Sequence, residues 1–169
     1  MHKLIFVFII LTMLCSCSTY EKLVQSKDID YKLTKANEYY DKGKFFEASR
    51  VYESLMPALR GTKNYEELYY RFAYSFYYDK DYLNAAYQFK NFTEFFTKSP
   101  RAEEMQFMYA ISTFKDSRKF SLDQTETEKA IAALQDFISM NPGSKYQEEA
   151  SQYLDSAYSK LEHKDANAA

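Results

Sequence analysis

The sequence predicts an all-α fold: a helix-turn-helix solenoid of about three repeats that ends in a capping helix. Only three glycines and three prolines occur in 169 residues, so few positions interrupt regular secondary structure. From about residue 29 to residue 162 apolar residues recur at helical spacing, and turn residues interrupt them roughly every 15 to 20 positions. The third observation is an internal repeat.

The repeat appears when residues 39–52 are aligned with residues 76–89, a displacement of 37 positions. Aromatic residues, the turn and an alanine coincide. A small residue in each helix lets the paired helix approach, because it leaves space for an aromatic side chain from that helix. The alanines predicted to pack the repeats in this way are Ala36, Ala48, Ala73, Ala85, Ala110 and Ala130. This pattern resembles the tetratricopeptide repeat, which implies antiparallel helix pairs stacked side by side.

A third, looser unit follows, with Ala110 in its first helix and Ala130 and Phe137 in its second. The long stretch between these helices, residues 117–125, is interpreted as an insertion. A last amphipathic segment is expected to cap the final pair. The helices expected from these patterns are 30–42, 45–58, 65–79, 82–97, 101–116, 124–140 and 144–162.

The N-terminus is typical of an exported protein. His2 and Lys3 precede an apolar run over residues 4–14, which fits a secretion signal and is too short to span a bilayer as a helix. The following Leu-Cys-Ser-Cys stretch, ending at Cys17, resembles a bacterial lipobox. That resemblance implies cleavage before Cys17 and acylation of this residue. The alternative is an ordinary signal peptide cleaved near the same position.

These features predict four segments along the chain. Residues 1–16 form a lipoprotein signal peptide, and residues 17–28 a polar, lipidated tether. Residues 29–163 form the tetratricopeptide-like domain. Residues 164–169 form a disordered tail.

The composition disfavours catalysis and nucleic-acid binding. The net charge of −2 provides no basic field for phosphates. The two histidines are His2, in the removed segment, and His163, near the C-terminus, so a histidine base is not expected in the folded body. Both cysteines lie at or before Cys17, and no nucleotide-binding or HExxH pattern occurs. We therefore expect a protein that is not an enzyme and has no cofactor and no metal site.

Tyrosines suggest where a partner binds. In the helix expected over 65–79, one aromatic face occupies the core positions of the repeat. Tyr70, Tyr74 and Tyr77 form a second aromatic face on the same helix. Tyrosine suits a groove for extended peptide, because it combines a flat apolar ring with a hydroxyl. The predicted peptide groove consists of Tyr40, Tyr70, Tyr74, Tyr77 and Phe107. The alternative is that this face packs on neighbouring helices or is covered by the tether.

The lipobox, the polar tether, the aromatic repeats and the stretch Ser121-Leu122-Asp123-Gln124-Thr125 before Lys129-Ala130-Ile131 resemble one family. The chain is similar to BamD (ComL), a lipoprotein of the machinery that inserts β-barrels into the bacterial outer membrane. The Arg60-Gly61 loop and the Tyr-rich, Gly-poor composition resemble its Bacteroidota branch.

The resemblance implies lipid anchoring in the outer membrane, facing the periplasm. It implies two sets of partners, other barrel-assembly subunits and unfolded outer-membrane proteins. The family usually has about five repeats, whereas three and a cap are expected here, so the chain is either shortened or specialised. A generic tetratricopeptide lipoprotein adaptor for another envelope complex is the alternative function.

Overall fold

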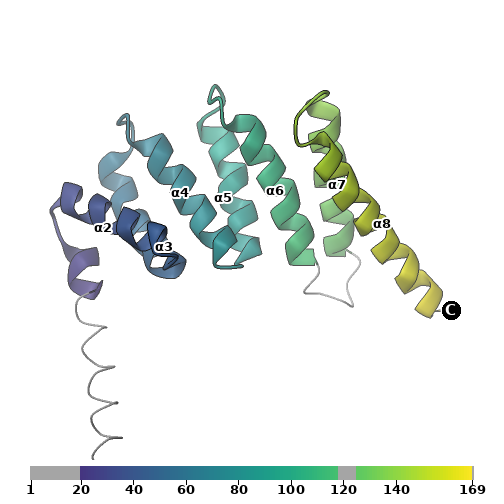
Figure 1. The fold of residues 1–169 in the computed structure, drawn as a ribbon, viewed down its shortest axis with the longest axis horizontal. Helices are drawn as coiled ribbons and strands as arrows, with labels where there is room; N and C mark the ends of the chain where they lie inside the picture. The colour runs from purple at the N-terminus through teal and green to yellow at the C-terminus, as the bar shows by residue number, and fades with distance from the viewer. Residues whose placement is uncertain (1–19, 118–124, 169) are drawn as a thin grey trace, which may run out of the picture. The chain divides into compact units, whose positions relative to one another are not determined.

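The computed structural model describes residues 20–117 and 125–168, and these are helical apart from short turns (Figure 1). The helices are α2 (Ile29–Asp41), α3 (Phe45–Leu59), α4 (Tyr65–Tyr78), α5 (Tyr82–Phe95), α6 (Ala102–Ser117), α7 (Thr125–Met140) and α8 (Gln147–Ala168). Each of the seven expected helices is present, and the predicted all-α, tetratricopeptide-like fold class is confirmed.

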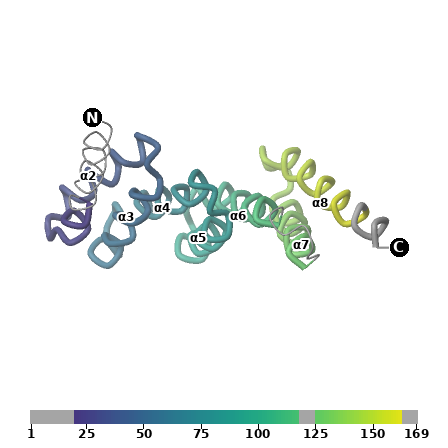
Figure 2. The backbone as a smooth tube through the Cα atoms, turned by 90° about the horizontal axis from the view of Figure 1, so that it is seen from below, coloured from purple at the N-terminus to yellow at the C-terminus, as the bar shows by residue number. Residues whose placement is uncertain are grey.

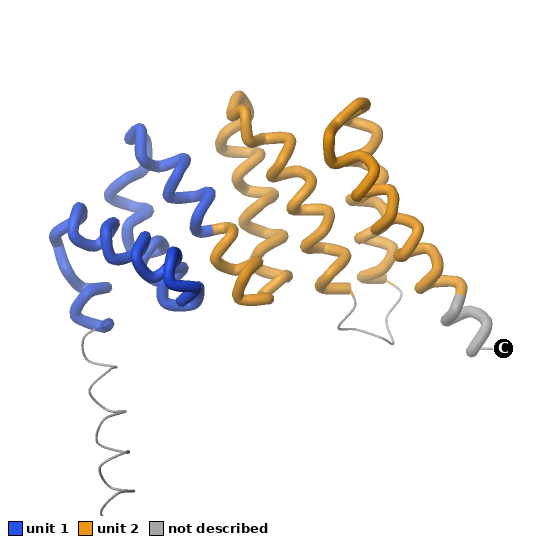
Figure 3. Tube along the Cα trace, in the orientation of Figure 1, with its two compact units in different colours: residues 1–72 blue, residues 73–169 orange. Residues whose placement is uncertain are grey.

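The chain divides into two compact units, residues 1–72 and 73–169, with the division inside α4 (Figure 3). In the first unit α2 packs against α3. Its core includes Val51, Tyr52 and Leu55 from α3, each 0 % exposed. Apolar side chains recurring at helical spacing thus bury one face of α3.

In the second unit α6 packs against both α5 and α7, and α8 packs against α7 and α6. Figures 1 and 2 show α6 between α5 and α7. Phe89, Met105 and Leu134 are 0 % exposed and come from α5, α6 and α7 respectively. The expected role of the last helix as a cap is consistent with its packing on the α6 and α7 pair.

The turns within the first two repeats have the same backbone structure. Gly43 has φ 72° and Lys80, 37 positions later, has φ 64°. In the first turn the Lys44 N–H donates to the Tyr39 carbonyl, and in the second the Asp81 N–H donates to the Phe76 carbonyl, both at 2.9 Å. The repeat seen in the residue types is therefore also a repeat of backbone conformation. Lys80 adopts a left-handed conformation that glycine tolerates better.

Two sequence-based expectations are corrected at the ends of the chain. Residues 20–25 are helical and Leu23 is only 6 % exposed, so this part of the expected tether packs on the protein. Helix α8 continues to Ala168, where a disordered tail was expected from residue 164. In both places the sequence is largely polar and lacks the apolar periodicity by which the other helices were predicted. Polar residues are nevertheless compatible with a helix.

Some expectations concern residues that the structure does not describe. The signal peptide, Cys17 and most of the insertion lie outside the described residues. Within residues 20–117 and 125–168, none of the helices is both long and apolar enough to cross a bilayer.

The shared turn yields a matched test of backbone strain. Lys80→Gly should raise the free energy of unfolding of the second unit by about 0.5–1 kcal/mol, because the left-handed penalty for a residue with a Cβ outweighs the entropy that glycine gains on unfolding. Gly43→Lys should lower the stability of the first unit by a similar amount. Urea unfolding followed by circular dichroism measures both. Lys80→Ala keeps the Cβ and is the control; a gain there equal to that of glycine would contradict the explanation.

Candidate functional site

Polar and aromatic side chains from neighbouring helices meet within each unit, and they include some of the residues from which the groove was predicted. Two clusters are present, one in each unit. The Arg71 cluster consists of Asn37, Tyr40, Asp41, Tyr52, Glu67 and Arg71. The Tyr77 cluster consists of Tyr74, Tyr77, Tyr82, Glu104 and Lys115.

Arg71 joins α2 and the first part of α4 in the first unit. Its Nη1 donates to Asp41 Oδ1 at 3.2 Å and its Nε donates to Glu67 Oε1 at 3.0 Å. Its guanidinium carbon lies 5.2 Å from the centre of the Tyr40 ring. The planar guanidinium thus combines two charge-assisted hydrogen bonds with a cation–π contact, an arrangement that lysine reproduces poorly.

Tyr52 lies beneath this arginine. It is 0 % exposed, and its hydroxyl donates to Asn37 Oδ1 at 2.7 Å. Burial raises the pKa of Tyr52, an effect that the nearby Arg71 charge partly offsets. For Arg71, burial lowers the pKa, but hydrogen bonding to Glu67 and the neighbouring Tyr52 outweighs burial and raises the pKa overall. The cluster therefore holds a neutral phenol below a permanently charged guanidinium.

The Tyr77 cluster joins the second part of α4 to α6. The Tyr74 hydroxyl donates to Glu104 Oε1 at 2.5 Å, and Lys115 Nζ donates to the Tyr77 hydroxyl at 2.7 Å. Lys115 Nζ also lies 4.8 Å and 5.5 Å from the ring centres of Tyr77 and Tyr82. Burial lowers the pKa of Lys115, but the contacts with Tyr77 outweigh burial and raise the pKa overall. Two α4 tyrosines thus form hydrogen bonds with charged side chains of α6, Tyr74 with Glu104 near its start and Tyr77 with Lys115 near its end.

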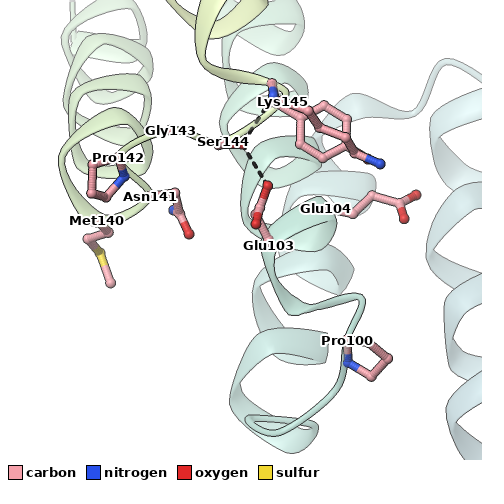
Figure 4. Close-up of a pocket in the computed structure, with 10 residues that line it drawn as sticks. Pro100, Glu103, Glu104, Met140, Asn141, Pro142, Gly143, Ser144 and Lys145 are labelled. Carbon is pink, nitrogen blue, oxygen red and sulfur yellow. Dashed lines mark hydrogen bonds between the residues drawn. The ribbon is translucent and has the colours of Figure 1, made fainter.

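A shallow hollow of about 550 Å³ lies where α6 begins and the chain turns from α7 into α8 (Figure 4). Its wall includes Glu103 and Glu104 from α6 and Ser144 and Tyr146 from the turn. The Glu103 carboxylate points toward Ser144, whose hydroxyl donates to Glu103 Oε1 at 2.7 Å. Among the described residues, no group of three or more His, Cys, Asp or Glu side chains is arranged to hold a metal ion.

The predicted groove residues do not share one environment. Tyr74 and Phe107 are 8 % and 3 % exposed, so the expectation that they line an open groove is corrected. Phe107 stacks on the Tyr146 ring at 4.5 Å, and Tyr74 contacts the Phe89 ring at 5.1 Å. The alternative, packing on neighbouring helices, applies to these two residues. Tyr40, Tyr70 and Tyr77 are half-buried and retain exposed surface.

All six predicted packing alanines are 0 % exposed, as their role requires. The sequence reasoning missed the charged partners Asp41, Arg71 and Lys115. A signal for Arg71 was present, because Glu67 lies four residues before it and a helix brings such a pair together. No comparable sequence signal pairs Lys115 with Tyr77, since the two are 38 residues apart.

Comparison with known families agrees with this architecture. Residues 26–169 match the sequence model of the YfiO family, described as outer membrane lipoprotein. The chain belongs to this family. The match covers both units and supports an outer-membrane location and the BamD-type resemblance. A search of curated proteins finds no match.

The Tyr74 hydrogen bond is testable by removal of one oxygen atom. Tyr74→Phe should lower the free energy of unfolding of the second unit by about 1–2 kcal/mol, because a hydrogen bond to a charged acceptor is lost while the ring packing stays. Urea unfolding of the variant measures the change. Tyr87→Phe is the matched control, since Tyr87 is 62 % exposed. Equal effects of the two substitutions would mean that the Glu104 contact contributes nothing.

Proposed function

We propose that this chain is a lipid-anchored periplasmic scaffold of the outer-membrane β-barrel assembly machinery, which binds partner subunits and unfolded barrel substrates. The observation that carries the proposal is the match to an outer membrane lipoprotein family over residues 26–169. The paired helices support it, because repeats of this kind present extended surfaces to other proteins. The proposal assigns no catalytic residue, cofactor or metal to the chain.

Of the predicted groove residues, Tyr40 in the Arg71 cluster and Tyr70, which directly precedes Arg71 on α4, are best suited to contact an extended peptide. Tyr40 and Tyr70 are half-buried, so each offers part of an aromatic ring at the surface. Flat, rigid aromatic side chains contact peptide with little loss of conformational entropy. Unfolded barrel segments alternate apolar and polar side chains, which complements a face that is both aromatic and hydrogen-bonding.

The ion pairs of Arg71 also allow a bound peptide to replace one of its carboxylate partners. Arg71 is 29 % exposed, whereas Asp41 and Glu67 are 67 % and 49 % exposed. Exposed ion pairs contribute little stability, so a carboxylate or carbonyl of a bound peptide can replace one of them. The cation–π contact with Tyr40 then keeps the guanidinium in place.

A second candidate function, a generic lipoprotein adaptor for another envelope complex, is favoured by α5. Leu83 and Tyr87 are 64 % and 62 % exposed and lie one turn apart on that helix. An exposed apolar pair on a rigid helix suits a folded partner better than an unfolded chain.

Site-specific crosslinking separates the two functions. A photoreactive phenylalanine in place of Tyr70, in cells that express the lipidated protein, should capture unfolded barrel precursors, and the Tyr40→Ala change in the same chain should reduce the yield several-fold. The same probe in place of Tyr158, an exposed residue of α8, is the control. Co-purification should recover barrel-assembly subunits. Capture of folded enzymes alone, without these subunits, would refute the barrel-assembly function.

Membrane anchoring has its own matched pair of variants. Cys17→Ser should remove the acyl groups and shift most of the protein out of the outer-membrane fraction, because each buried CH₂ of an acyl chain contributes about 0.8 kcal/mol to membrane binding. Cys15→Ser should keep both the acylation and the location. Mass spectrometry of the N-terminal peptide and membrane fractionation are the measurements. Retention of Cys17→Ser in the outer membrane would show that another feature anchors the chain.

A further inference from the structure

The helical segment at residues 20–25 is fixed to the first unit. Leu23 is 6 % exposed, and Lys32 Nζ from α2 donates to the Val24 carbonyl oxygen at 2.8 Å. Lys32 is itself only 4 % exposed, and burial lowers its pKa. An apolar anchor and a shielded hydrogen bond therefore hold this segment, so it does not act as a flexible spacer.

Tyr20 places the start of this segment beside α3. Burial raises the pKa of Tyr20, and the charge of the neighbouring Arg50 partly offsets that effect. A groove of about 490 Å³ runs between the segment and α3. It is lined by Tyr20, Glu21, Val24, Gln25, Arg50, Glu53 and Ser54. Tyr20, the first described residue, therefore lies in the wall of this groove.

The distance to the acylated residue is short. Cys17 precedes Tyr20 by three residues, and three residues span at most about 11 Å when fully extended. A freely flexible tether over residues 17–28 would instead allow an average separation of roughly 18 Å in any direction. Because residues 20–25 are held on the first unit, the lipid anchor restricts which side of that unit meets the membrane.

We propose that the face of the first unit formed by Tyr20, Phe46 and Arg50, here called the anchor face, rests on the headgroups of the phospholipid bilayer. The inference rests on the proposed acylation of Cys17. It adds to the proposed function an orientation of the first unit, with a defined surface against the membrane.

The chemistry of the anchor face fits a membrane interface. Phe46 is 59 % exposed and lies one helical turn before Arg50 on α3. Aromatic rings favour the headgroup region, and a guanidinium binds lipid phosphates. Arg50 Nη1 donates to Glu53 Oε2 at 2.9 Å, but both side chains are more than half exposed, at 58 % and 57 %. Such a pair contributes little, so a lipid phosphate can take the place of Glu53.

Radical footprinting of the native lipoprotein tests the orientation. The acylated chain is purified, its lipid mass is verified, and it is reconstituted in vesicles of phosphatidylethanolamine and phosphatidylglycerol. Hydroxyl-radical oxidation of Phe46 should be several-fold slower than in the unacylated Cys17→Ser protein in solution. Inserting a glycine-serine linker of about 12 residues between Ser18 and Thr19 should restore most of the oxidation, since its average reach is roughly 19 Å.

The possible results separate this inference from the proposed function. Equal oxidation of Phe46 in the acylated and unacylated proteins, or protection that the linker does not change, overturns the anchor face while leaving barrel assembly intact. Absence of the acyl mass overturns both the anchor face and the lipid-anchored scaffold. Failure to recover barrel-assembly subunits, with Phe46 still protected, overturns the scaffold partner alone.

Discussion

Close approach of paired helices at small residues is the constraint on which the remaining structure depends. The six packing alanines are 0 % exposed, and so are Tyr52 and Phe89, which occupy equivalent positions in the first two repeats. A larger side chain at an alanine site would displace the paired helix, since protein interiors are close-packed. The turns at Gly43 and Lys80 have the same left-handed backbone conformation at the point where each repeat passes from its first helix to its second.

The aromatic side chains that this pairing does not use have different environments in the two units. In the second unit Tyr74, Tyr77 and Phe107 bind or stack on neighbouring helices. The rings of Tyr74 and Phe107 are therefore buried, whereas Tyr77 is half-buried and its hydroxyl is bound by Lys115. In the first unit Tyr40 remains half-buried beneath a charged arginine that has exposed carboxylate partners. This difference is why the proposed peptide contact lies at the Arg71 cluster.

The proposed lipid attachment and the proposed peptide contact both belong to the first unit. Its helical N-terminal segment, held by Leu23 and Lys32, would limit the freedom of a chain acylated at Cys17 as proposed. For the proposed scaffold, a held orientation would lower the entropy lost when a membrane-embedded partner binds. Membership of an outer membrane lipoprotein family is consistent with such an arrangement.

The sequence by itself determined the helices, their pairing and the buried alanines, because helical periodicity and a 37-residue repeat are local and regular. Only the tertiary structure decided which tyrosines stay at the surface. Tyr70 and Tyr74 lie on one helical face, yet Tyr70 is half-buried and Tyr74 is buried. Their difference depends on what packs against each turn of α4. Likewise, the partners Tyr77 and Lys115 are 38 residues apart, and a contact at that separation exists only once the helices have packed.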